Sequence, residues 1–140
     1  MLIEFSVTNF LSFSEKQTLS MVADSSTELE ATHTFLPTGK AKLPRLLPCV
    51  GIYGANAAGK SNLLLAMKVM RKIVLSSAKD SEVGEPIQGI HSHALFTNQP
   101  TEFEILFIVE GVRYQYGFAA TRELITEEWL FAFPAGRSQQ

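Results

Sequence analysis

The feature that most constrains this chain is one short loop sequence, Gly54-Ala55-Asn56-Ala57-Ala58-Gly59-Lys60-Ser61. It matches G-x-x-x-x-G-K-[ST], the spacing of a phosphate-binding loop (the Walker A motif). An apolar run, Leu46 to Tyr53, precedes the loop, and a helical pattern beginning at Asn62-Leu63-Leu64 follows it. Strand, glycine-rich turn and helix form the setting in which this motif binds phosphate. The sequence therefore predicts an α/β fold built around a P-loop strand–helix unit.

Each part of this P-loop has an expected role in binding a nucleotide. Backbone amides at the start of a helix are unpaired and lie at the positive end of the helix dipole, so they attract phosphate. Two glycines let the backbone approach the ligand closely. We expect Lys60 to reach the β- and γ-phosphates as the catalytic cation, and the Ser61 hydroxyl to bind Mg²⁺. The predicted cofactors are ATP and Mg²⁺, and the predicted binding residues are Gly54, Ala55, Asn56, Ala57, Ala58, Gly59, Lys60, Ser61 and Asn62. A glycine-rich turn that precedes a helix by chance is the alternative.

Composition limits the class of protein. Hydrophobic residues make up 46% and charged residues 19% of the 140 residues, which is typical of a globular domain. The net charge of −2 does not support tight binding to nucleic acid. The single cysteine, Cys49, is expected to be a small core residue in a reducing cytoplasm. Because Met1 to Phe10 alternates and no apolar run approaches about 18 residues, we expect no signal peptide and no membrane span.

The first half of the chain is expected to hold a strand pair and a long loop before the P-loop unit. Residues 1–23 predict two antiparallel strands, Met1 to Asn9 with Ile3, Phe5 and Val7 on one face, and Lys16 to Ala23. Residues 24–45 are rich in polar residues, glycine and proline, which predicts a solvated surface loop; a segment bordering the nucleotide is the alternative. The apolar run from Leu46 to Tyr53 predicts a central strand buried on both faces and beginning after Pro48.

The second half is expected to hold one helix and an antiparallel meander. The P-loop strand and helix occupy residues 46–79, with the helix running from about Gly59 to Ala78. Its apolar stripe is predicted from Leu63, Met67, Met70 and Val74, widened by Leu64 and Ile73. The cations Lys68, Arg71 and Lys72 predict a solvated face, with a DNA-contacting patch as the alternative.

Residues 90–134 predict the meander. Its strands are expected at Thr101 to Val109, Val112 to Ala120 and Leu124 to Phe133, with Glu110-Gly111 as a hairpin turn. A short strand is expected at His91 to Phe96. His91 and His93 share a face there, but without a third ligand nearby a metal site is the weaker reading, and their role stays open.

Several segments resemble a known family. They are Asn9-Phe10-Leu11-Ser12-Phe13, Gly51 through Asn62, Tyr114-Gln115-Tyr116-Gly117-Phe118 and Glu127-Glu128-Trp129-Leu130. Together they resemble the SMC/RecF-like branch of ABC-type ATPase heads, and most closely the bacterial AAA family ATP-binding proteins of that branch, many of them encoded with antiphage defence systems. The resemblance spans nearly the whole chain. Leu11 departs from it, because relatives often carry a basic residue that approaches the nucleotide there.

The resemblance implies an ATPase whose heads dimerise, or form a higher oligomer, around ATP and hydrolyse it, with a nuclease or toxin as a possible effector partner. It also implies that residues 1–140 are a single partial domain, the N-terminal lobe of such a head. Alternatives are a DNA repair or recombination ATPase and a nucleotide-switched interaction module without catalysis. A GTPase or a small kinase is disfavoured, because no base-reading Asn-Lys-x-Asp segment and no arginine-rich lid occur in the sequence.

The sequence lacks the groups that would activate water. Hydrolysis in such heads needs a strand ending in Asp-Glu and a Ser-Gly-rich signature segment, and neither occurs. Glu110 ends an apolar run but belongs to the hairpin signal. Gln115 is read as an outward strand residue, with a γ-phosphate-sensing glutamine as the alternative, and Glu123, Glu127 and Glu128 are read as surface charges. We therefore expect these residues alone to bind phosphate weakly and to hydrolyse ATP poorly or not at all.

Overall fold

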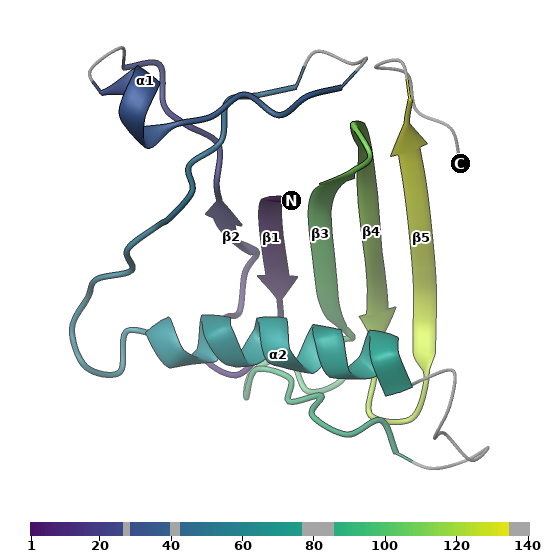
Figure 1. Cartoon of the computed structure of the whole chain (residues 1–140). Helices are drawn as coiled ribbons and strands as arrows, with labels where there is room; N and C mark the ends of the chain where they lie inside the picture. Colours follow the sequence, from purple (N-terminus) through teal and green to yellow (C-terminus); the bar gives the residue numbers. More distant parts are fainter. Residues whose placement is uncertain (27–28, 40–42, 77–85, 135–140) are drawn as a thin grey trace.

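Five antiparallel strands form one sheet, and a long helix crosses one face of it (Figure 1). The computed structural model describes residues 1–26, 29–39, 43–76 and 86–134. The elements in chain order are β1 (Leu2–Thr8), β2 (Gln17–Ser20), α1 (Glu30–His33), α2 (Lys60–Ser76), β3 (Thr101–Val109), β4 (Val112–Ala120) and β5 (Ile125–Phe133). The strand order is β2-β1-β3-β4-β5, so β1 joins the N-terminal strand pair to the meander. The fold is therefore α/β, as expected, with a wholly antiparallel sheet.

The hairpin between β3 and β4 has the turn that its sequence predicts. Val109 pairs with Val112, and the two residues between them, Glu110 and Gly111, have φ angles of 51° and 76°. Two consecutive positive φ angles are typical of a type I′ turn, which matches the twist of the flanking strands. The hairpin reading of Glu110 is therefore confirmed.

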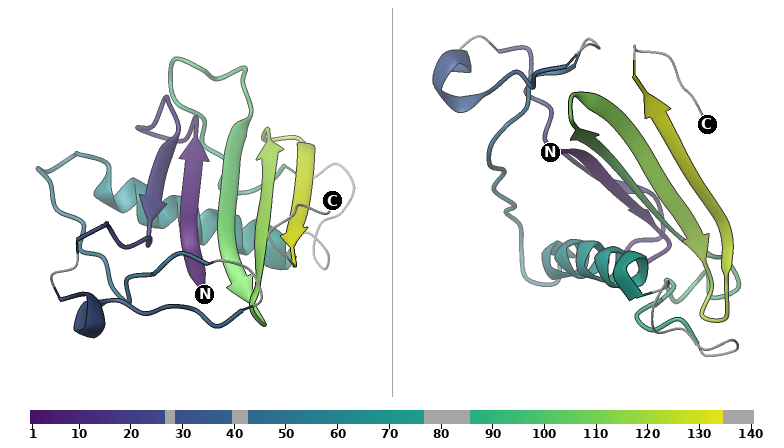
Figure 2. Two further views of the ribbon diagram at one scale, coloured as in Figure 1. Left: turned by 90° about the horizontal axis from the view of Figure 1, so that it is seen from above. Right: turned by 45° about the vertical axis from the view of Figure 1, so that its right-hand side comes forward.

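The main core lies between α2 and one face of the sheet. Phe103 and Phe118 are fully buried, with ring centroids 5.3 Å apart, and Phe10 packs edge-on against Phe103 at 5.7 Å. From α2 the buried residues are Ala66, Val69, Met70 and Ile73. Figures 1 and 2 show that α2 crosses the strands near one end, so the other end of this face is left uncovered by the helix.

The apolar stripe of α2 agrees with the prediction at Leu63, Met67, Met70 and Ile73, which lie in or against the main core, and differs at two positions. The prediction placed Leu64 and Val74 on the buried side, but they are 60% and 42% exposed. Ala66 and Val69 are buried in the main core instead. The predicted continuation of the helix to Ala78 lies outside the described residues. Lys68, Arg71 and Lys72 are exposed, as predicted for a solvated face.

Ile3 does not share a face with Phe5 and Val7, contrary to the prediction. The pairing of β1 with β3 shifts between Leu2 and Glu4, which is a β-bulge. A bulge adds one residue to a strand and so reverses the side on which later residues lie. Phe5 and Val7 enter the main core, whereas Ile3 packs in a second cluster with Leu43, Leu46 and Ile108.

This second cluster covers the opposite face of the sheet, since Ile108 and Phe103 lie on opposite sides of β3. The 24–45 connection supplies part of its cover and is therefore more than a solvated loop. Its short helix α1 is tied back by Arg45, whose Nε lies 3.0 Å from Glu30 Oε1 and 2.9 Å from Thr34 Oγ1. No described contact joins this connection to the P-loop.

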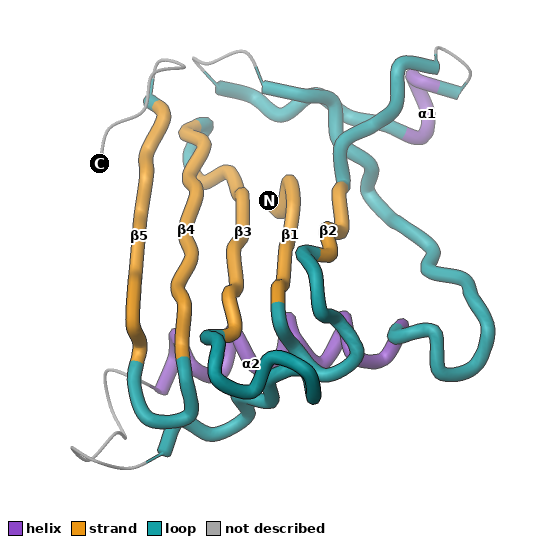
Figure 3. The backbone as a smooth tube through the Cα atoms, turned by 180° about the vertical axis from the view of Figure 1, so that it is seen from behind, coloured by secondary structure: helices purple, strands orange, loops and turns teal. Residues whose placement is uncertain are grey.

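The predicted strand from Leu46 to Tyr53 is wrong for this structure. Within this run Leu46 alone forms bridges, to Val22 and Phe35, which lie outside the sheet, and the following residues form a coil that leads to α2 (Figure 3). Tyr53 is 94% exposed, and Cys49, expected in the core, is exposed too. The apolar pattern is that of a buried strand, but the described chain offers no neighbouring strand with which it could pair.

Among the residues that the structure describes, no helix is long and apolar enough to cross a membrane.

Replacing Gly117 with alanine is expected to destabilise the sheet by about 1–3 kcal/mol, measured by urea unfolding. A Cβ there would lie 2.4 Å from Trp129 Cζ2 and 2.7 Å from the Phe103 carbonyl oxygen, and the backbone atom cannot move aside. Gly51→Ala is the matched control, because its nearest neighbour is the exposed ring of Tyr53. Equal unfolding midpoints for Gly117→Ala and Gly51→Ala would contradict the packing argument.

Candidate nucleotide-binding site

Residues 54–59 form a turn that leads directly into α2, which begins at Lys60. Within the loop the Ala58 amide donates to the Ala55 carbonyl (3.2 Å), and the Leu63 amide donates to the Gly59 carbonyl (3.1 Å). No other amide from Ala55 to Asn62 has a hydrogen-bond partner among the described residues. A series of free N–H groups at a helix start is a site suited to a phosphate group.

Gly59 packs closely against the turn that follows β1. Its φ angle is 87°, a left-handed value that favours glycine. A Cβ at Gly59 would lie 2.7 Å from Phe13 Cε1 and 3.1 Å from Ser12 Oγ. The turn that follows β1 therefore packs directly against the P-loop. Ala57 also has a positive φ, 64°, which is uncommon for a residue with a side chain and typical of a functional loop.

The side chain of Lys60 folds back onto the loop that precedes it. Its Nζ donates to the carbonyl oxygens of Gly54 (2.7 Å) and Ala55 (2.6 Å). These two bonds hold the ammonium group beside the loop without a carboxylate partner among the described ion pairs. The neighbouring Ser61 is exposed, so its hydroxyl is open to solvent. The arrangement places a cation, a hydroxyl and free amides together at the start of α2.

The predicted site residues from Gly54 to Asn62 are contiguous, and the structure keeps them on one loop and helix start. Asn62 differs from the expectation in one respect, because its side chain is already engaged: Nδ2 donates to Ser12 Oγ (2.8 Å). Its side chain is therefore directed to the β1 turn, and its backbone amide remains free. Ser12 and Phe13 belong to one of the segments that resemble the known family, but the sequence did not predict that they contact the P-loop.

Asn9 is a residue whose structural role the sequence did not reveal. It is 2% exposed, and its Nδ2 lies within 3.2 Å of three carbonyl oxygens, those of Phe96, Gln99 and Pro100. Its Oδ1 accepts from the His93 amide (2.9 Å), and its carbonyl accepts from Thr101 Oγ1 (2.8 Å). This one carboxamide fixes the connection before β3, which is a loop and not the short strand predicted at His91 to Phe96.

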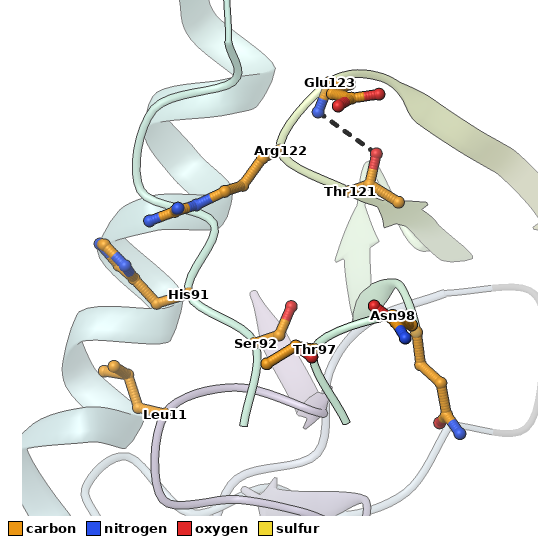
Figure 4. Close-up of a pocket in the computed structure, with 9 residues that line it drawn as sticks. Leu11, His91, Ser92, Thr97, Asn98, Thr121, Arg122 and Glu123 are labelled. Atoms are coloured by element: carbon orange, nitrogen blue, oxygen red, sulfur yellow. Dashed lines mark hydrogen bonds between the residues drawn. The ribbon is translucent and has the colours of Figure 1, made fainter. Parts of the chain in front are cut away.

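A polar pocket of about 690 Å³ lies elsewhere, between this loop and the β4–β5 turn (Figure 4). Its lining includes Leu11, His91, Arg122 and Glu123, and none of residues 54–62. His93 does not line it: its Nδ1 accepts from the Leu95 amide at 3.2 Å. Within the described ranges no group of three His, Cys, Asp or Glu residues is placed to hold a metal. The pocket is thus distinct from the P-loop.

Gln115 belongs to a polar cluster on the face of the sheet opposite α2, which fits the outward strand residue and not a phosphate sensor. Its Nε2 donates to Glu104 Oε2 (2.7 Å), and Glu104 also accepts from Trp129 Nε1 (3.2 Å) and Lys16 Nζ (3.1 Å). Burial alone would raise the pKa of Glu104, but the bonds from Gln115, Lys16 and Trp129 outweigh burial and lower it.

The lowered pKa of Glu104 predicts a pH-dependent contribution to stability. A carboxyl whose folded pKa lies below its unfolded value of about 4.5 stabilises the fold above that value. The contribution is lost as the pH falls through the folded pKa. We expect Glu104→Gln to lower the urea midpoint at pH 7 and to differ less from the parent chain near pH 3. A gap between the two midpoints that widens on acidification would contradict this account.

Of the acidic residues near the start of β5, Glu128 has a described partner. Its Oε1 accepts from the Tyr116 hydroxyl at 2.7 Å. Burial, together with the negative charge of Glu128, raises the pKa of Tyr116. Glu123, Glu127 and Glu128 are all exposed, as predicted for surface charges, and none of them contacts the P-loop through a described bond.

The chain matches a known family of domains. No curated protein matches the chain. Residues 49–139 match the family described as "AAA domain, putative AbiEii toxin, Type IV TA system". AAA domains are P-loop units of the nucleotide-binding, ATPase type, and the matched range contains residues 54–61, α2 and the strands β3, β4 and β5. Because the match covers well over half of the chain, the protein belongs to this AAA domain family.

Proposed function

We propose that residues 54–62 bind the phosphates of ATP together with Mg²⁺. The observation that carries this proposal is the series of free amides that runs from the Gly54 turn into the start of α2. The Lys60 ammonium is the cation for the β- and γ-phosphates, and it would exchange its two loop carbonyls for phosphate oxygens. Ser61 would hold Mg²⁺, which when bound neutralises charge on the phosphates.

We also propose that the chain is the N-terminal lobe of an SMC/RecF-like, ABC-type head and that a second layer covers it. Two features support this. The apolar coil before the P-loop ends in Tyr53, which is 94% exposed, and has no strand to pair with in the described chain. On the outer side of α2, Leu64 and Leu75 are exposed as well. A strand added beside residues 49–53 would pair their backbone and bury Tyr53, and further residues laid over α2 would bury Leu64 and Leu75.

The 140-residue chain alone is then expected to bind ATP and to hydrolyse it poorly or not at all. Among the described residues no hydrogen bond or ion pair brings an Asp or Glu side chain to residues 54–62, and the sequence has no strand ending in Asp-Glu to supply a base for water. A phosphate-release assay at saturating Mg-ATP tests this. Steady-state turnover by the purified chain that disappears in Lys60→Ala would refute it.

In the intact protein we propose ATP-dependent dimerisation of heads, ATP hydrolysis and a cytoplasmic role in antiphage defence with a toxin or nuclease effector. The family description, which names a toxin and a toxin–antitoxin system, supports this context. Light scattering with and without Mg-ATP tests the dimer. A molecular mass that ATP leaves unchanged in a chain carrying both lobes would count against it.

A further inference from the structure

The turn after β1 is joined to the start of α2 by one side-chain hydrogen bond and one close packing contact. The hydrogen bond runs from Asn62 Nδ2 to Ser12 Oγ (2.8 Å). The packing contact is the ring of Phe13 against Gly59, close enough that a Cβ on Gly59 would clash with it. Both contacts fall at the P-loop, since Gly59 is its second glycine and Asn62 carries its last free amide.

The turn itself is held firmly by the sheet. Asn9, at its base, is buried and makes the hydrogen bonds described above to the loop before β3. Phe10 is fully buried, and the backbones of Phe10 and Phe13 pair with each other at 2.9 and 2.8 Å. The Leu11 amide donates to the His91 carbonyl (2.8 Å). The turn is therefore a fixed support and not a free loop.

The P-loop, by contrast, has little support of its own. Residues 51–58 are all exposed, and the described backbone bond within the loop is the one between Ala58 and Ala55. An exposed loop with few contacts opens easily, which lowers the affinity for a ligand that needs one ordered conformation. A contact that holds the loop against the sheet would reduce the conformational entropy that the loop loses when a ligand binds.

We propose that Ser12 and Asn62 are positioning residues, whose hydrogen bond holds the P-loop amides in the geometry that binds phosphate. The proposal rests on nucleotide binding by residues 54–62 and adds a residue from outside the motif to that site. Ser12 acts through Asn62 and need not touch the nucleotide. Because Ser12 is exposed, removing its hydroxyl leaves no buried polar group unpaired and should not unfold the chain.

A double-mutant cycle on the Kd for Mg-ATP tests the coupling. Ser12→Ala and Asn62→Ala are each expected to weaken binding about 3- to 10-fold, with the double variant no weaker than either single variant. Ser12→Thr, which keeps the hydroxyl, is expected to stay close to the parent. The matched control is the Ser6 Oγ–Thr18 Oγ1 bond (3.1 Å), where Ser6→Ala and Thr18→Ala should leave the Kd unchanged. Additive losses, or no loss, would overturn the proposal.

Amide hydrogen exchange without nucleotide separates this proposal from the proposed function. Ser12→Ala is expected to speed exchange of the Ala58 and Leu63 amides, which are hydrogen-bonded to the loop carbonyls of Ala55 and Gly59, whereas the Ser6→Ala control leaves those two rates unchanged. Equal exchange rates in the parent chain and in Ser12→Ala would overturn the positioning role of Ser12, whether or not the chain binds ATP. If the parent does not bind ATP, or Lys60→Ala binds it equally well, the proposed function fails, and the exchange rates still decide whether Ser12 orders the loop.

Discussion

Lys60→Ala is expected to weaken Mg-ATP binding by roughly 10- to 150-fold while leaving the fold intact. A hydrogen bond to a charged group contributes about 1.5–3 kcal/mol, which corresponds to that range in Kd. The fold should be unaffected because the Lys60 ammonium contacts two carbonyls of an exposed loop and no core residue. Isothermal titration calorimetry gives the affinity, and urea unfolding gives the stability.

Lys68→Ala is the matched control, because Lys68 is an exposed cation on the same helix and has no bond to the P-loop among the described contacts. It removes the same charge from α2, so a general loss of positive potential would weaken both variants alike. Equal affinities for Lys60→Ala and Lys68→Ala would mean that the lysine of the motif does not bind the nucleotide.

Phe103→Ala is expected to lower the free energy of unfolding by about 3–5 kcal/mol. Phe103 is fully buried between Phe10 and Phe118, and its ring fills the space where the sheet meets the turn that supports the P-loop. Since a domain of this size has a stability of about 5–15 kcal/mol, the variant should unfold at a much lower urea concentration.

Phe133→Ala controls for the loss of an aromatic ring. Phe133 lies at the end of the edge strand β5, partly exposed, with the Arg113 guanidinium carbon 4.2 Å above its ring. Its removal should cost on the order of 1 kcal/mol. A smaller loss for Phe103→Ala than for Phe133→Ala would show that the main core is not where the structure places it.

Strands and their turn could be predicted from sequence where the pattern is local. The alternation from Thr101 to Val109, the Glu110-Gly111 pair and the returning strand together specify a hairpin, and the structure confirms it. The P-loop motif likewise specified a turn followed by a helix, with α2 beginning at Lys60. Such features depend on neighbours within a few residues, which sequence patterns record.

Features that depend on distant neighbours were not predictable in this way. An apolar run such as Leu46 to Tyr53 indicates that the segment is suited to burial. Whether the segment forms a strand depends on another strand being present to pair with it. Which residues of α2 are buried depends on its packing against strands far away in the sequence. The bond between Ser12 and Asn62 joins residues 50 positions apart, so no local pattern marks it.

The central claim is that the amides of the P-loop bind phosphate, and an NMR titration of the ¹⁵N-labelled chain with Mg-ATP tests it most directly. We expect the largest amide shifts at Ala55 to Asn62, with inorganic tripolyphosphate moving the same signals. Shifts centred on His91 and Arg122, which line the separate polar pocket, with the P-loop signals unmoved, would contradict the account.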